Sequence, residues 1–276
     1  MFFFACGQFR TTLIAFYRAS HLDKLGVYMD ESTQKIHQAL QTVARLRHER
    51  LSNTNLAHAN FEIKRFQAHR FQASYADLLC DPRYMQAAQF FLRELYSDKD
   101  YAERDEQFGK IAGTVAKLFP QAVIDTTTAL AQVHALTESL DDSMARQWLI
   151  DTCQQAQSSP QARYVRCWRR VEDEAARTKQ LSVVLLLGHE LDRLTRKPGL
   201  RSLLKMMRRP AGVAGLSALQ LFLESGFDAF AEMHGAQAFL SVIAERETEW
   251  IRLLFDSDTV TCETKLADLL SKNSTS

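Results

Sequence analysis

The sequence predicts an all-α protein, a multi-helix bundle of roughly nine or ten helices with no confident strand. Apolar residues recur at intervals of three and four along most of the chain, which is the spacing of amphipathic helices. Glycine and proline are scarce, with 10 and 5 among 276 residues, and this favours long helices over short strands and turns. A content of 46% hydrophobic and 24% charged residues is ordinary for a globular protein, so we do not expect disorder.

Charge and cysteine content argue against several classes of protein. The net charge of +1 at pH 7 gives no overall attraction to nucleic acid or to an anionic membrane. The five cysteines are odd in number and never form a C-x-x-C pair, so we expect neither a disulfide framework nor a cysteine zinc site. We expect small buried thiols in a reducing compartment, and therefore a cytoplasmic location.

We expect a single helical domain over residues 30–255, preceded by a weakly structured leader at residues 1–29 and followed by a polar tail at residues 256–276. The leader is rich in apolar residues, but two arginines interrupt it, and no apolar run anywhere is long enough to span a membrane. The Ser-Ser-Pro sequence at residues 158–160 marks the point where two subdomains would meet.

The chain opens with two amphipathic helices. Residues 32–50 place Ile36 and Val43 on one stripe, and a serine and a threonine at the start can cap the helix. Residues 56–79 form the second helix, which ends because the residue before Pro82 avoids the α conformation.

Two further helices flank a polar hinge, residues 97–107. Residues 84–96 carry Leu92 on a buried face, and a new helix from about residue 100 carries Phe108 on its own buried face until it ends at residues 119–120. Serine and aspartate residues in the hinge are good N-caps, and the acidic residues that follow suit the positive end of a helix dipole.

The second half continues the helical pattern. The expected elements are helices at residues 121–140 and 142–157, one long helix or two at residues 161–195, a short basic helix at residues 201–209, a loop at residues 210–215, a helix from residue 216 ending at His234-Gly235, a helix from about residue 239 to 254, and a short helix near residues 266–270. The apolar run at residues 181–188 suits a buried strand or a fully buried helical turn, and its helical flanks favour the helix.

The sequence lacks the common catalytic and metal-binding motifs. It has no G-x-x-x-x-G-K-[ST] or G-x-G-x-x-G loop, no complete H-E-x-x-H, and no Glu-x-x-His pair of the di-iron type. Gly215 to Leu219 begins like a nucleophile elbow but lacks the last glycine. We therefore expect no metal and no cofactor, and we lean towards a protein that is not an enzyme.

The hinge is the best candidate for a site. Tyr96, Asp100, Arg104 and Asp105 form a polar cluster there, and the acid-arginine-acid arrangement exceeds what a helix cap requires. A network of ion pairs that fixes the angle between two helices is the structural alternative.

Arginines and aromatic residues also alternate in one segment. Arg163, Arg166, Arg169 and Arg170, with an interleaved tyrosine and tryptophan, would suit phosphate contacts and base stacking. Three acidic residues follow at once, so a solvated helix face is the favoured interpretation, and we do not expect nucleic acid to be a partner.

Three histidines deserve a functional hypothesis beside a structural one. His134 and Glu138 lie one helical turn apart and would serve as a base with its orienting carboxylate, or as an ordinary boundary pair. His189 follows an apolar run and would be a buried ligand or base, or a satisfied core histidine. His69, beside Arg65, has the same two interpretations.

Four segments resemble a family of bacterial proteins of unknown function. They are FFLRELYSDKDYAERDEQ at residues 90–107, LFP at 118–120, LDDSM at 140–144 and RRPAGVAGLSALQLFLESGFDAFAEM at 208–233. The resemblance spans most of residues 75–247 and implies one soluble bacterial domain, without any activity, cofactor or catalytic residue.

Two functional hypotheses follow. The first is a helical protein that acts through association with a protein partner or with itself, supported by the apolar-rich late helices. The second is an all-α enzyme or small-ligand binder with a pocket between helices near residues 96–105.

Overall fold

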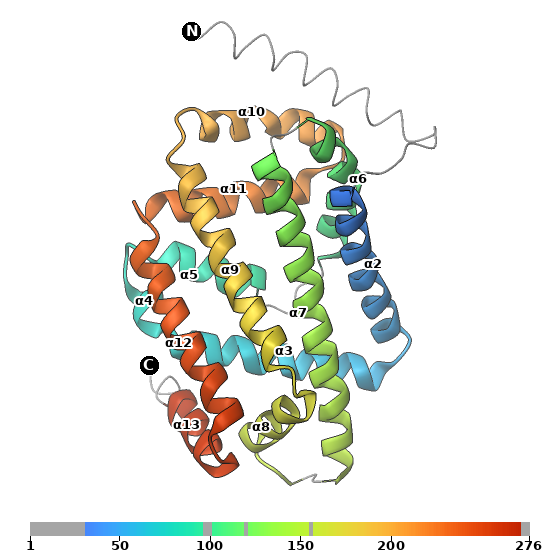
Figure 1. Ribbon diagram of the computed structural model, residues 1–276, viewed down its shortest axis with the longest axis vertical. Helices are drawn as coiled ribbons and strands as arrows, with labels where there is room; N and C mark the ends of the chain where they lie inside the picture. Colours follow the sequence, from blue (N-terminus) through green and yellow to red (C-terminus); the bar gives the residue numbers. More distant parts are fainter. Residues whose placement is uncertain (1–30, 96–100, 119–120, 155–156, 272–276) are drawn as a thin grey trace, which may run out of the picture.

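The computed structural model describes residues 31–95, 101–118, 121–154 and 157–271, and within these ranges it contains twelve helices and no strand. The expected all-α bundle is confirmed. The leader, residue 96 and residues 97–100 of the hinge lie outside the described residues. With the labels of Figure 1, the helices are α2 (Glu31–Leu51), α3 (Thr54–Ser74), α4 (Ala76–Cys80), α5 (Met85–Leu95), α6 (Ala102–Leu118), α7 (Gln121–Gln154), α8 (Pro160–Val171), α9 (Glu174–Thr195), α10 (Leu200–Val213), α11 (Ser217–Glu232), α12 (Gln237–Asp256) and α13 (Thr259–Ser271).

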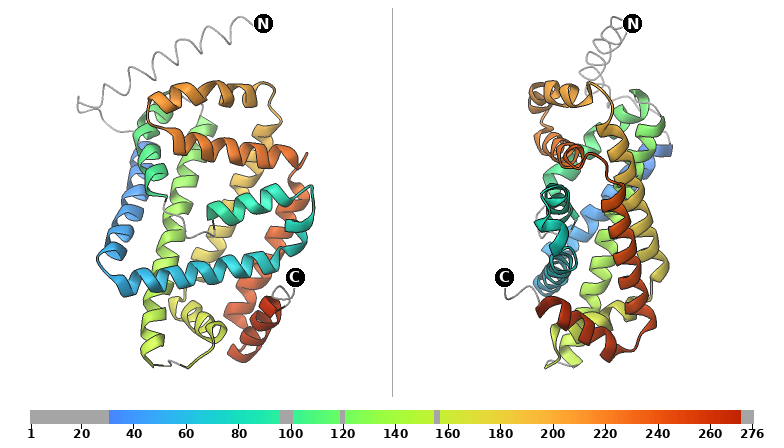
Figure 2. Two further views of the ribbon diagram at one scale, coloured as in Figure 1. Left: turned by 180° about the vertical axis from the view of Figure 1, so that it is seen from behind. Right: turned by 90° about the vertical axis from the view of Figure 1, so that its left-hand side faces the viewer.

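The helices form two layers. α2, α7, α9 and α12 run along the length of the molecule, each in contact with the next, and α7 is the longest (Figure 1). On one side of them, α3, α5, α11 and α10 cross the long axis one above another (Figure 2). α8 and α13 pack together at the end opposite α10. Among the described residues, no helix combines the length and the apolar character of a membrane span.

Buried apolar side chains form three clusters between the layers. One joins α3, α7, α8, α12 and α13 around Tyr164 and Trp168. A second joins α3, α5, α11 and α12 around Phe91, Phe230 and Phe239. A third joins α2, α6, α7 and α11. α3, α5 and α11 thus bury one face against the lengthwise layer, which is how amphipathic helices of this pattern are stabilised.

The helix expected at residues 56–79 is broken at Tyr75, so this prediction was wrong. The Tyr75 backbone leaves the helical region, with φ −123° and ψ 25°, and its ring is fully buried. Its hydroxyl donates to Glu247 on α12 at 2.8 Å, and Arg70 donates to both oxygens of that carboxylate at 3.0 and 2.8 Å. A tertiary contact, rather than a local breaker, therefore divides α3 from α4.

The two helices expected at residues 121–140 and 142–157 are a single helix, α7. Asp141 and Asp142 lie where the two helices were expected to divide, but each has a hydrogen-bond partner within the continuous helix. Gln67 donates to Asp141 at 3.1 Å, and Arg146 donates to Asp142 at 2.7 Å.

The apolar run at residues 181–188 is helical, as favoured, but it is not fully buried. It lies in α9, which packs against α7 and α12 and leaves its outer side to solvent (Figure 1). Leu186 is 54% exposed, whereas Gly188 on the other side is buried. The flanking Glu172, at φ 50°, ends α8 and divides residues 161–195 into two helices.

Residues 210–215 were expected to be a loop, and this prediction was also wrong. α10 continues through Pro210 and ends at Val213, and Gly215, with φ 69°, lies in the turn that follows. The helix expected near residue 266 is longer than predicted, because α13 begins at Thr259 and buries Cys262, Leu266 and Leu270. The four cysteines of the described residues differ in exposure: Cys167 and Cys262 are buried, while Cys80 and Cys153 are exposed.

We predict that Glu247→Gln lowers the free energy of unfolding by about 2–4 kcal/mol, because it leaves the buried Arg70 guanidinium without its charged partner. Glu245→Gln on the same helix is the control, since Glu245 is exposed and should change stability by under about 0.5 kcal/mol. Urea unfolding followed by circular dichroism measures both, and equal effects would contradict the role given to Glu247.

Candidate functional site

One face of α7 directs ionisable side chains into the interior. His134, Glu138 and Asp141 step by four and three residues, so they project from the same side of the helix. Facing helices supply the partners of these groups. We call the full set the charged core: Arg47 and Arg50 from α2, Lys64 from α3, Arg104 and Asp105 from α6, and His134, Glu138 and Asp141 from α7.

Asp105 is the acceptor that joins α6 to α2 and α7 within the charged core. It accepts a hydrogen bond from Arg47 at 2.8 Å and lies 3.2 Å from His134 Nε2, with Arg104 at 3.6 Å. Burial raises the pKa of this carboxyl, but His134, Arg47 and Arg104 outweigh burial and hold the pKa below its ordinary value. Asp105 is therefore a buried anion surrounded by two guanidinium groups and an imidazole.

Glu138 is the second main acceptor of the charged core. Its two oxygens accept hydrogen bonds from Arg50 at 2.7 Å and Lys64 at 2.5 Å. Burial again raises the pKa, while Lys64, Arg50 and His134 together bring it below the ordinary value of a glutamate. The hydrogen bonds of Glu138 thus reach α2 and α3, whereas His134, which the sequence paired with Glu138, forms its hydrogen bond with Asp105.

Asp141 behaves in the opposite way. Burial raises its pKa, the neighbouring Glu138 anion adds to the rise, and Lys64 and Arg177 do not compensate. The surroundings of two carboxyl groups three residues apart on one helix therefore shift their pKa values in opposite directions. Pairs of acids whose environments separate their pKa values are common at functional sites, although structural networks also produce them.

Arg104 connects the charged core to an apolar region. Its guanidinium lies 4.1 Å from the ring centroid of Tyr101 and 4.9 Å from that of Phe222, and it donates to Glu94 at 3.0 Å. Of the hinge cluster predicted from the sequence, Arg104 and Asp105 thus meet in one site. Tyr96 and Asp100 lie outside the described residues.

A chamber of about 270 Å³ opens next to this point, between α5, α7, α9 and α11. Its walls are mainly aliphatic and aromatic, and they include Phe90, Leu130, Leu187, Leu191, Phe222 and Phe230. We call it the apolar chamber. It shares Glu94, Leu130 and Phe222 with a smaller cavity of about 70 Å³ that borders Arg104, Asp105 and His134. The apolar chamber therefore adjoins the charged core.

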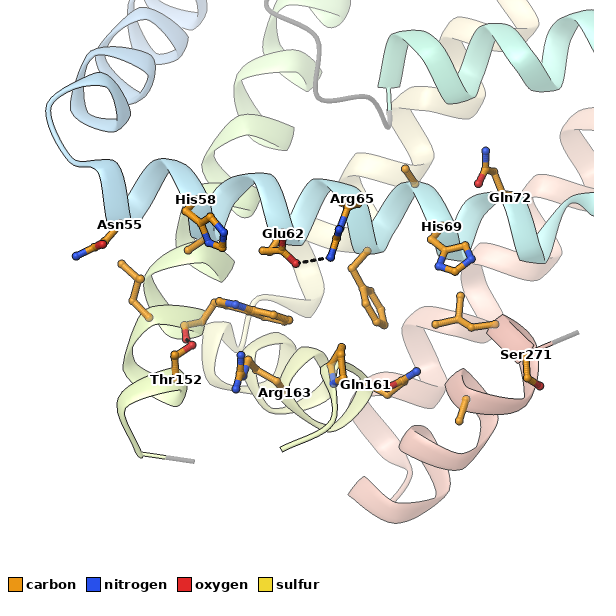
Figure 3. A pocket seen from close by; sticks show the side chains of 18 residues that line it. Asn55, His58, Glu62, Arg65, His69, Gln72, Thr152, Gln161, Arg163 and Ser271 are labelled. Atoms are coloured by element: carbon orange, nitrogen blue, oxygen red, sulfur yellow. Dashed lines mark hydrogen bonds and ion pairs between the residues drawn. The ribbon is translucent and has the colours of Figure 1, made fainter. Parts of the chain in front are cut away.

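A larger hollow of about 970 Å³ lies on the surface between α3, α7, α8 and α13 (Figure 3). Phe66 and Trp148 are among its apolar wall residues, while His58, Glu62, Arg65 and His69 line the α3 side. Arg65 donates to Glu62 at 2.8 Å. We call this hollow the surface groove, and His69 is one of the residues that line it.

The arginine cluster of α8 is engaged within the protein. Arg166 donates to both oxygens of Asp151 at 2.8 and 2.7 Å, Arg170 donates to it at 3.2 Å, and Arg163 lies 3.5 Å from it. Arg169 donates to the Leu254 carbonyl at 3.0 Å and also to the Ser257 carbonyl. Asp151 is fully buried, and hydrogen bonding to Arg166 is the main reason that its pKa lies below the ordinary value. These arginines join α7, α8 and α12.

The hypotheses for His189, a buried ligand or base or a core histidine, are both wrong. His189 is exposed, so it neither lies in a buried pocket nor serves as a core residue. In the described part of the chain, no group of three or more histidine, cysteine, aspartate or glutamate side chains is arranged to hold a metal ion.

We predict opposite effects of two neutral substitutions in the charged core. At pH 7, Glu138→Gln should lower the free energy of unfolding by about 2–4 kcal/mol, because Arg50 and Lys64 lose a buried anion. Asp141→Asn should leave stability unchanged or raise it, because burial and the neighbouring Glu138 anion disfavour the ionised form of Asp141 in the native protein. Urea unfolding measures both, and a loss in Asp141→Asn as large as that in Glu138→Gln would contradict the assignment.

The pH dependence has a defined sign. The contribution of Glu138 is present above the ordinary glutamate pKa of 4.5 and is lost as pH falls through its lower native value. The deficit of Glu138→Gln should therefore shrink below that pH. For Asp141 the native pKa is raised, so ionisation reduces stability as pH rises above 3.8, and the relative advantage of Asp141→Asn should grow with pH.

Comparison with known proteins places the chain in a family but assigns no activity. No curated protein and no solved structure matches it. The model of one family, described as Domain of unknown function (DUF8198), matches residues 45–261, a range that includes α3 to α12 completely and every residue of the charged core. The chain belongs to this family of unknown function.

Proposed function

We propose that the protein binds a small, mainly apolar molecule in the apolar chamber, with a polar group of that molecule next to Glu94 and Arg104. The observation that carries this proposal is the apolar chamber itself, a hollow of about 270 Å³ between four helices whose walls are almost entirely apolar. Protein interiors are normally filled to the density of organic crystals, so an apolar hollow of this size is the usual form of a ligand site.

The chamber has an inner end and a mouth. Glu190 and Arg193 on α9 line it, with side chains 29% and 50% exposed, and this supports a mouth beside them. Glu94 and Arg104 are both largely buried, and their hydrogen bond marks the inner end. A ligand of one or two rings, or a short acyl chain, would place its apolar body among Phe90, Leu191 and Phe222 and its polar group at this ion pair.

We predict that N-phenyl-1-naphthylamine, an uncharged apolar probe, binds the wild-type protein with increased fluorescence. Leu187→Trp should weaken its binding at least tenfold, because Leu187 lines the chamber and the larger side chain fills it. Leu186→Trp is the matched control, since the adjacent Leu186 is 54% exposed and should leave the affinity unchanged. Probe titration of the three proteins measures the affinities. Equal loss in both variants, or no binding by the wild type, would overturn the proposal.

Self-association is a second candidate, and exposed apolar residues at one end of the molecule favour it. Met206 and Val213 on α10 and Leu221 on α11 are among the most exposed large apolar side chains of the described residues. Side chains of this kind gathered on neighbouring helices are typical of interaction surfaces.

We predict that Met206→Lys shifts any dimer towards monomer by at least tenfold in dissociation constant, because it places a charge in the apolar contact. Val260→Lys is the control: Met206 and Val260 are both 71% exposed, but Val260 lies on α13 at the other end of the molecule (Figure 1). Sedimentation velocity over a concentration series measures the equilibrium. A wild-type protein that stays monomeric throughout would remove this candidate.

Nucleic-acid binding through Arg163, Arg166, Arg169 and Arg170 has the weakest support. Each of these guanidinium groups already has an acceptor or a carboxylate within the protein. Phosphate contacts would have to replace those interactions, so the arrangement weighs against this function.

A further inference from the structure

Positive charge is concentrated in one segment of the chain. Residues 193–223 contain seven lysine and arginine residues and no aspartate or glutamate. Because the whole chain carries a net charge of +1, the remaining residues together carry a charge of −6. A positive segment in a chain that is otherwise negative is typical of a surface that meets an anionic partner.

Four of the seven cations have an acidic partner within the protein. The pairs are Arg193 with Glu190, Arg196 with Asp192, Arg201 with Asp228 and Arg208 with Glu224. Lys197 and Arg209 form no ion pair within the described residues. Lys205 reaches Glu224 only at a longer range than the ion pair that Arg208 forms with it. Three positive charges at this end of the molecule therefore lack a carboxylate of their own.

α10 presents two of these cations beside apolar side chains. Lys205, Met206, Arg209 and Val213 are exposed and recur at intervals of one, three and four residues, so they share the side of α10 that faces solvent. We call these four residues the outer face of α10. Met206 is 71% exposed and Val213 is 84% exposed. α10 lies across one end of the molecule with α11 and α9 as its main neighbours, so the outer face is turned away from the bundle (Figure 1).

The mixture of cations and aliphatic side chains distinguishes between anionic partners. At a bilayer surface, lysine and arginine meet anionic headgroups while aliphatic side chains enter the apolar layer beneath them. Nucleic acid offers phosphates but no apolar layer, and the outer face has no aromatic side chain on which bases could stack. A second copy of the chain would bring two positive faces together, which like-charge repulsion opposes. An anionic bilayer is the partner that uses both kinds of residue.

We propose that the outer face of α10 docks on an anionic lipid bilayer, with α10 lying in the plane of the surface rather than crossing it. Lys205 and Arg209 contact the anionic headgroups, Met206 and Val213 enter the boundary of the acyl region, and Lys197 adds to the attraction. This inference is independent of the ligand proposed for the apolar chamber.

The test uses the full chain and measures its co-sedimentation with vesicles of phosphatidylcholine, with and without phosphatidylglycerol. The wild-type protein should bind the anionic vesicles and not the neutral ones, and the binding should weaken as salt is added, because salt screens exposed charges. Lys205→Gln combined with Arg209→Gln should weaken the binding about 25-fold, since each basic residue near an anionic bilayer contributes a factor of about five.

Arg252→Gln combined with Lys265→Gln is the matched control. Both residues are exposed, neither forms an ion pair within the described residues, and they lie on α12 and α13 near the opposite end of the molecule (Figure 1). This double variant changes the net charge equally and should bind vesicles as the wild type does. Equal loss in the two double variants, or equal binding of the wild type to neutral and anionic vesicles, would overturn the proposal, as would no binding at all.

The apolar part of the contact has its own test. Met206→Gln keeps the charge but removes an apolar side chain, so it should weaken vesicle binding several-fold. Val260→Gln, at a residue of equal exposure on α13, should not. Full vesicle binding by Met206→Gln would indicate a purely electrostatic contact and would overturn the insertion into the bilayer.

One further variant separates this surface from the apolar chamber. Leu187→Trp fills the apolar chamber and should leave vesicle binding unchanged, because Leu187 lies on α9 and not on the outer face of α10. Loss of vesicle binding in Leu187→Trp would assign that binding to the apolar chamber and would overturn docking through α10.

Discussion

The arrangement of this bundle depends on the partners that the buried acids of α6 and α7 require. Asp105, Glu138 and Asp151 are buried carboxylates, and each accepts hydrogen bonds from cations on other helices. Removing one partner of a buried ion pair costs about 3–5 kcal/mol, whereas a surface pair contributes about 0–1 kcal/mol. The buried pairs therefore constrain how α2, α3, α6 and α8 sit on α7, while apolar contacts supply most of the general stabilisation.

The charged core and the apolar chamber lie on different sides of α7, and Arg104 lies between them. Polar groups gather on the α2 and α3 side of α7, and apolar side chains enclose the chamber on its α9 and α11 side. Arg104 lies on the border, held by Glu94 and by the faces of Tyr101 and Phe222. A protein that needed only stability would gain from filling the chamber with larger side chains. The ion pair of Glu94 and Arg104 at the border of the hollow supports the proposed ligand.

Helical periodicity alone predicted the architecture and most element boundaries, because amphipathic spacing reports directly which face is buried. The errors occurred where tertiary contacts override local signals. Tyr75 breaks a helix because Glu247, far along the chain, holds its hydroxyl, and Asp141 stays helical because Gln67 satisfies it. Neither partner could be identified from spacing.

The candidate site was predictable only in part, for the same reason. Arg104 and Asp105 were conspicuous as charges beyond the needs of a helix cap, and both belong to the charged core. Arg47, Arg50 and Lys64 gave no comparable signal, since a basic residue at the margin of an amphipathic helix usually faces solvent. The arginines of α8 illustrate the reverse case: their density suggested a ligand surface, but one buried acid, Asp151, accounts for three of them.

Two glycines explain how the apolar chamber keeps its shape. A Cβ atom on Gly226 of α11 would lie 2.9 Å from the Phe90 ring, and one on Gly188 of α9 would lie 2.6 Å from Leu240. Both distances are shorter than van der Waals contact, so the helices approach their neighbours closely only because these positions lack side chains. Since Gly188 and Gly226 also line the chamber, the tight contacts hold its walls in place. The chamber is thus a space between closely packed helices, and a Cβ atom at either glycine would require the facing side chain, Leu240 or Phe90, to shift.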